Sequence, residues 1–250
     1  MNSSPEGTPS VIFDLDGTLV DSEPNAYESV RLLLERYGVP DFTWEQNARF
    51  IGISNPEALA VLRAEYGIAA SVDELVAGQD AIYLDLARKS TEVFPRMREF
   101  VELLHARGVA MAVASGSSLA GIEAVLTSTG LGAFLTAQVS ADEVRRGKPE
   151  PDVFLEAARR LGAAPAACVV VEDAVPGAKA AHAAGMRCIA VPYVPASATD
   201  PAFAAAGLLF PGGQDEFTAR AAYAWLFPGS HPVPDGPGPA SRPRRARRLR

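Results

Sequence analysis

Residues 11–13 form a continuous apolar run, and the chain then turns polar at Asp14 and Asp16, with Gly17 directly after. A strand with one face in water would alternate apolar and polar residues, whereas an unbroken apolar run is typical of a strand buried on both faces. The two carboxylates therefore lie at the carboxyl end of a buried strand, the edge at which open α/β sheets bind ligands. Aspartates also end strands and cap helices, so a purely structural role stays open for this pair alone.

A second motif follows the apolar segment 109–114, where Ser115 and Gly116 open a serine-rich turn before residues with helical spacing. This pattern predicts a strand, a tight turn and a helix. Backbone N–H groups and hydroxyls at a helix N-terminus bind anions, so Ser115 and Gly116 are candidate phosphate ligands. Helix capping by the serines accounts for the same residues.

Lys148 and the acidic pair Glu172 and Asp173 complete the set of candidate site residues. Lys148 stands just before Pro149, which we expect in the first turn of a helix, and it offers a compact positive charge. The acids follow the apolar run 169–171, a second buried strand by the same argument as the first. Magnesium binds through one or two carboxylates, water and substrate oxygens, so Asp14, Asp16, Glu172 and Asp173 are candidate ligands for Mg²⁺.

These four motifs, in this order, resemble the haloacid dehalogenase-like hydrolase superfamily, and specifically its beta-phosphoglucomutase-like branch, over about residues 10–195. The resemblance implies that Asp14 is a nucleophile that accepts the phosphoryl group as an aspartyl phosphate. It implies that Asp16 is the acid/base, with its backbone carbonyl on the metal, and that Ser115 holds the phosphate. Lys148 would neutralise charge, and Asp173 with Glu172 would bind the metal.

The segment 22–91 separates the first two motifs, and its apolar residues recur at helical spacing. It resembles the helical cap of that branch. The expected fold is therefore α/β: a Rossmann-like parallel sheet with helices on both faces, plus a small α-helical cap domain inserted after the first strand. We expect the α/β core at 10–21 and 92–227, the cap at 22–91, and flexible termini at 1–9 and 228–250. The expected strands are 10–14, 109–114, 135–139, 168–172 and 187–191.

The resemblance implies a Mg²⁺-dependent phosphatase that hydrolyses a small organic phosphate monoester, such as a sugar phosphate. Two alternatives stay open. Mutases of this branch carry a histidine and an arginine on the cap where this chain has Ala26 and Asn55, which weakens the mutase interpretation. A non-catalytic sensor of phosphorylated ligands is the other alternative, and the pairing of Asp14 with Asp16 favours an enzyme over it, because a binder needs neither nucleophile nor proton shuttle.

The net charge of −7 conceals six arginines within residues 242–250, without which the net charge is −13. An acidic body makes nucleic acid an improbable partner for the core, while the basic tail follows a Pro/Gly-rich stretch and is expected to be a solvated appendage. No apolar stretch reaches the length of a membrane span, and the polar N-terminus is unlike a signal peptide. We therefore expect a cytoplasmic protein whose partner is a small phosphorylated metabolite. The oligomeric state stays open, with a monomer slightly favoured.

Overall fold

A computed structural model describes residues 8–51 and 53–230, and its centre is a six-stranded sheet in the order β5-β4-β1-β6-β7-β8. All the pairs in this sheet are parallel. The strands are β1 (Ser10–Phe13), β4 (Met111–Ser115), β5 (Ala137–Ser140), β6 (Cys168–Glu172), β7 (Arg187–Ala190) and β8 (Leu208–Leu209).

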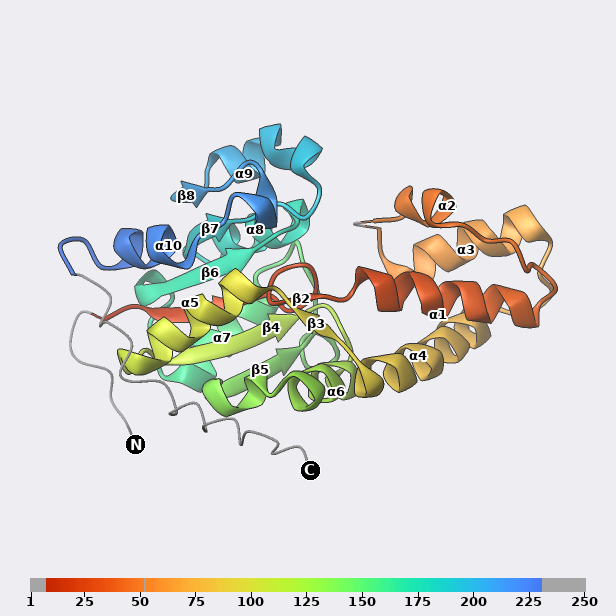
Figure 1. Cartoon of the computed structure of the whole chain (residues 1–250), viewed down its shortest axis with the longest axis horizontal. Helices are drawn as coiled ribbons and strands as arrows, with labels where there is room; N and C mark the ends of the chain where they lie inside the picture. Colours follow the sequence, from red (N-terminus) through yellow and green to blue (C-terminus); the bar gives the residue numbers. More distant parts are fainter. Residues whose placement is uncertain (1–7, 52, 231–250) are drawn as a thin grey trace, which may run out of the picture.

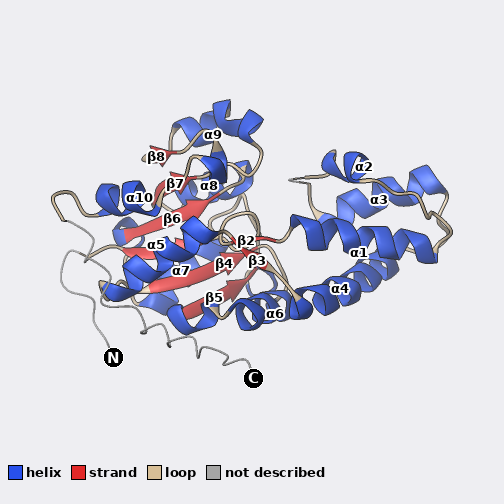
Figure 2. Cartoon of the chain, in the orientation of Figure 1, coloured by secondary structure: helices blue, strands red, loops and turns tan. Residues whose placement is uncertain are grey.

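Helices cover both faces of this sheet (Figure 2). Val11 and Phe13 of β1 join the apolar cluster on one face, and Ile12 joins the cluster on the other. Because neighbouring side chains point to opposite faces, the unbroken apolar run serves both layers. The helices are α5 (Pro95–Ala106), α6 (Leu119–Thr129) and α10 (Ala219–Leu226) on the face of Phe13, and α7 (Asp152–Leu161), α8 (Val175–Ala183) and α9 (Pro201–Ala204) on the face of Ile12.

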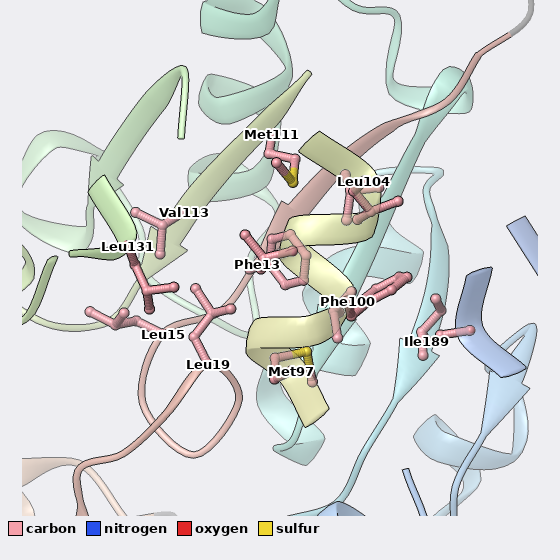
Figure 3. Packing of buried hydrophobic residues seen from close by; sticks show 14 of the residues in the cluster. Phe13, Leu15, Leu19, Met97, Phe100, Leu104, Met111, Val113, Leu131 and Ile189 are labelled. Carbon is pink, nitrogen blue, oxygen red and sulfur yellow. The ribbon is translucent and has the colours of Figure 1, made fainter. Parts of the chain in front are cut away.

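Phe13 illustrates how the core fixes the site. Its ring meets Phe100 of α5 edge to face, with ring centroids 6.0 Å apart, and both side chains are fully buried (Figure 3). Burying an aromatic side chain of this kind contributes roughly 2–3 kcal/mol. The strand end that carries Asp14 is therefore anchored by the residue directly before it.

Four helices stand between β2 (Val20–Asp21) and β3 (Glu92–Val93), two short antiparallel strands that leave and re-enter the core side by side. These helices lie together beside the sheet, and the arrowheads of β4 and β5 point toward them (Figure 1). They bury a separate apolar cluster that includes Leu33, Leu59 and Leu75. The helices are α1 (Glu23–Arg36), α2 (Trp44–Ala48), α3 (Asn55–Tyr66) and α4 (Val72–Lys89).

The expected fold class is confirmed, and the differences are local. The strands end one or two residues away from several expected bounds, and β8 adds a sixth strand that the sequence did not indicate. The placement of Pro149 in the first turn of a helix was wrong: α7 begins at Asp152, and Pro151 is the residue before it.

Residues 1–7 and 231–250, which include the arginine-rich tail, lie outside the described residues. They make up most of the two segments, 1–9 and 228–250, that we expect to be flexible. Within 8–51 and 53–230, no helix has the length and apolar character that crossing a membrane requires.

Candidate active site

The topology brings the ends of β1 and β6 together, because these two strands pair directly. Asp14 follows β1, while Glu172 ends β6 and Asp173 follows it. All three carboxylates are buried, with Asp14 6% exposed and Asp173 9% exposed. Such a concentration of buried acid requires positive charge close by.

Lys148 supplies that charge. Its Nζ donates to Oδ1 of Asp14 at 2.5 Å and to Oε1 of Glu172 at 2.6 Å. It is carried by the segment between β5 and α7. Lys148 therefore joins the ends of both central strands.

Glu172 is fully engaged by donors of the protein itself. Its Oε1 accepts from Lys148, and its Oε2 accepts from the backbone N–H groups of Asp173 and Ala174 at 2.8 and 2.9 Å. Gly177 packs against the same carboxylate, since a Cβ there would lie 1.6 Å from Oε1. The carboxylate of Glu172 thus orients Lys148 and the turn after β6.

Asp173 is held against the loop that follows Asp14. Thr18 Oγ1 donates to its Oδ1 at 3.0 Å. Gly17 has φ +79°, and a Cβ on it would lie 2.4 Å from Oδ2 of Asp173. A glycine is required here both for the left-handed backbone and for the close approach of the carboxylate.

Asp16 has different surroundings from Asp14, although only Leu15 separates them. Its Oδ2 accepts from the hydroxyls of Ser115 at 3.1 Å and Ser117 at 2.6 Å. Its Oδ1 accepts from the hydroxyl of Tyr83, on α4, at 3.3 Å. Asp16 therefore lies between the serine turn of the core and the inserted helices.

The pKa values reflect this crowding. Burial raises the pKa of Asp14 to about 8, with further contributions from Glu172 and Asp16, against the lowering effect of Lys148. Burial, with the charges of Glu172 and Asp14, holds the pKa of Asp173 well above its usual range. Burial lowers the pKa of Lys148, but the adjacent carboxylates outweigh that effect and keep it above the usual value. The site therefore holds more negative charge than one lysine balances.

The carboxylates of Asp14 and Asp173 suit a hard divalent cation. The Oδ2 atom of each accepts no hydrogen bond from the described residues, so two carboxylate oxygens are free for a ligand. Within 8–51 and 53–230, no three His, Cys, Asp or Glu side chains form a converged metal-binding group. Two carboxylates completed by water and phosphate oxygens match the preference of magnesium better than that of zinc.

A cleft of about 460 Å³ lies between the serine turn and the inserted helices. Asp16, Gly116 and Ser117 line it on the core side, and Tyr83 and Asn55 line it on the helical side. A small phosphorylated molecule fits a cavity of this size.

The sequence identified Asp14, Asp16, Lys148, Glu172 and Asp173, and the structure brings all five to the same end of the sheet. Ser115 contacts Asp16, and Gly116 lines the cleft. Three further residues contact the site carboxylates but were not predicted from the sequence as site residues: Thr18, Ser117 and Tyr83. Thr18 and Ser117 stand within the motifs themselves, while Tyr83 is 67 residues from Asp16 and only the tertiary fold brings them together.

The family model described as haloacid dehalogenase-like hydrolase matches residues 9–185 of this chain. The chain belongs to the haloacid dehalogenase-like hydrolases. Phosphatases of this family generally use a divalent metal ion.

Relatives with assigned activities include a bifunctional riboflavin kinase/FMN phosphatase from Arabidopsis thaliana, 35% identical over 195 residues. That match covers 78% of this hydrolase and 51% of the plant protein, so the chain spans about half the length of that relative. The fructose-1-phosphate phosphatase YqaB from Escherichia coli strain K12 is 36% identical over 187 residues, which cover 72% of this chain and 95% of that enzyme.

Among solved structures, the beta-phosphoglucomutase from Clostridium difficile superposes with a TM-score of 0.69. The match is 22% identical and covers 88% of this chain and 97% of that one. At this identity it establishes a shared fold.

Proposed function

We propose that this hydrolase is a Mg²⁺-dependent phosphatase acting on a small organic phosphate monoester, such as a sugar phosphate. The observation that carries the proposal is the contrast between Asp14, ion-paired with Lys148 at the end of β1, and Asp16, which lies at the cleft among hydroxyls. Two carboxylates in different surroundings can divide the work of nucleophile and proton carrier. The phosphatases among its relatives support the same reaction.

In this mechanism a carboxylate oxygen of Asp14 attacks phosphorus, and the bond from phosphorus to the ester oxygen breaks. Asp16 donates a proton to the departing alcohol oxygen. Asp16 then takes a proton from water, whose oxygen attacks the aspartyl phosphate and releases inorganic phosphate and free Asp14. Lys148 balances charge on the phosphoryl oxygens, and Ser115 with the backbone of Gly116 holds them.

We assign the metal to Asp14, Asp173 and the backbone carbonyl of Asp16. A bound Mg²⁺ neutralises charge on the phosphoryl group and favours the ionised form of both carboxylates. Glu172 is the fourth acid expected to bind the metal, but both its oxygens already accept internal hydrogen bonds. We therefore assign to it the positioning of Lys148.

Residues 22–91 act as a cap in this proposal, and residues 10–21 with 92–227 as the catalytic core. The paired strands β2 and β3 form the joint between them. A cap that closes over the cleft excludes bulk water from the first chemical step and contacts the leaving group.

The test is phosphate release from p-nitrophenyl phosphate and from a panel of sugar phosphates, with Mg²⁺ and with chelator. We expect release to require the metal and to fall at least about 10³-fold in Asp14→Asn, because the amide is not a nucleophile. Asp41→Asn, an exposed change on the cap, is the matched control and should retain activity. Circular dichroism confirms that both variants fold.

Activity that persists in Asp14→Asn would rule out the covalent route. Retained binding of a phosphate ester, with no release from any member of the panel, would favour the non-catalytic sensor instead.

A further inference from the structure

The cleft is acidic on both sides of the entrance to the site. Four carboxylates line it: Asp16, Glu23, Asp80 and Asp142. Among the described residues that line this cleft, none is a lysine, an arginine or a histidine. The positive charge of Lys148 lies deeper, where it is shared by Asp14 and Glu172.

Asp80 and Asp142 face the cleft from opposite sides. Asp80 is on α4 of the cap, and Asp142 is in a short 3-10 helix (Ala141–Glu143) directly after β5 of the core. Both line the same cleft, and the charge of Asp142 adds to partial burial in raising the pKa of Asp80. A group that binds in this cleft therefore meets like charge from both the cap and the core.

The other polar side chains of the cleft are neutral: hydroxyls such as Ser117 and Tyr83, and amides. Asn47 is only 7% exposed, and its side-chain amide has no hydrogen-bond partner among the described residues. Asn55 Nδ2 donates to Oε1 of the buried Gln79, and Gln79 Nε2 donates to Ser29 at 2.7 Å. Asn47 thus keeps both a donor and an acceptor for a ligand, as Asn55 keeps its amide oxygen.

We propose that the leaving group of the substrate is an uncharged, hydroxyl-bearing alcohol, and that Asp80 and Asp142 exclude alcohols that carry a second phosphate or another anionic group. This inference rests on the proposed phosphatase activity. A hydroxyl group both donates and accepts, and so it matches the amide of Asn47, which has no partner among the described residues. A second phosphate would instead meet carboxylates of like charge, with no cation among the described lining residues to receive it.

The size of the discrimination follows from simple electrostatics. Asp80 and Asp142 are exposed, so water and salt screen them, and each pair of unit charges about 7 Å apart changes binding by roughly two- to threefold. A phosphate dianion that faces two carboxylates is therefore disfavoured by about tenfold or more.

The experiment compares kcat/KM for fructose 1-phosphate with that for fructose 1,6-bisphosphate, which differ only in the second phosphate. We expect the monophosphate to be preferred by at least about tenfold. In the double variant Asp80→Asn, Asp142→Asn this preference should shrink by about fivefold or more. Asp85→Asn, an exposed change on the same helix that does not line the cleft, should leave the preference unaltered.

Equal kcat/KM values of the unaltered enzyme for the two fructose phosphates would overturn the inference. A preference for the monophosphate that is unchanged in the double variant would overturn it as well. p-Nitrophenyl phosphate, which carries no second anionic group, separates this outcome from failure of the proposed function. If phosphate is released from p-nitrophenyl phosphate, the proposed phosphatase activity is supported and only the proposed specificity is refuted. If none is released from any of these esters, the phosphatase fails and the inference falls with it.

Discussion

Asp14 and Asp16 are two residues apart, yet one is ion-paired with a lysine whose side chain is 12% exposed and the other accepts three hydroxyl hydrogen bonds. The cause is the turn at Gly17, whose N–H donates to the carbonyl of Val20 at 2.9 Å and whose φ is +79°. β1 has already ended at Phe13, so the turn and not the strand sets the direction of Asp16. A difference in surroundings between two identical side chains thus begins with one backbone conformation.

At this scale we predict that Gly17→Ala reduces activity severely. A side chain at positive φ costs about 1 kcal/mol of stability, and the added Cβ would displace Asp173 from its place beside Asp14. The matched control is Gly38→Ala, where φ is +83° and a Cβ would meet nothing within 4 Å. Both variants should lose similar stability from backbone strain in thermal unfolding, but only Gly17→Ala should lose turnover and metal affinity. Wild-type turnover in Gly17→Ala would contradict this interpretation.

At the scale of elements, α4 connects the cap to Asp16 at the candidate active site. Its buried residues Leu75 and Ile82 belong to the apolar cluster of the cap, while Tyr83, one residue further, reaches Asp16 of the core. Adjacent positions on a helix point in directions about 100° apart, so one helix can pack inside the cap and present a hydroxyl at the cleft. Packing of the cap therefore fixes where Tyr83 stands.

We predict that Tyr83→Phe lowers kcat/KM by about 3- to 10-fold, because a long hydrogen bond of 3.3 Å contributes about 1 kcal/mol. Because the lost bond is to Asp16, the pH dependence of the rate should shift as well. Tyr27→Phe removes a comparable hydroxyl within the cap, one that donates to the carbonyl of Phe42, and serves as the control. An unchanged pH profile in Tyr83→Phe would contradict a role of the Tyr83 hydroxyl in positioning Asp16.

At the scale of the whole molecule, Glu23 stands at the joint of cap and core. It is the first residue of α1, shortly after the strand that leaves the core, and it lines the cleft. Burial, together with the charges of Asp16 and Asp21, raises its pKa to about 7. The junction of the two parts therefore concentrates negative charge.

We predict that Glu23→Gln flattens the pH dependence of stability in the metal-free protein. A glutamate with a higher pKa in the folded state binds its proton more tightly there, so the free energy of unfolding falls as pH rises from about 4.5 to about 7. The variant should recover about 2–3 kcal/mol of this loss above pH 7. Urea unfolding at pH 5 and pH 8 measures it, with the exposed Glu102→Gln as control. Parallel curves for Glu23→Gln and the wild type would refute the prediction.

The sequence by itself determined the parallel sheet and the positions of Asp14, Ser115, Lys148 and Asp173, because each acts at the end of an apolar run or at a turn that local chemistry specifies. It also determined that residues 22–91 are helical, through their spacing. It could not determine the start of α7, the sixth strand or the role of Glu172, since these depend on packing and on backbone donors. Only the tertiary structure decided that Tyr83 meets Asp16 and that Asp80 faces Asp142, because contacts between distant segments leave no local pattern.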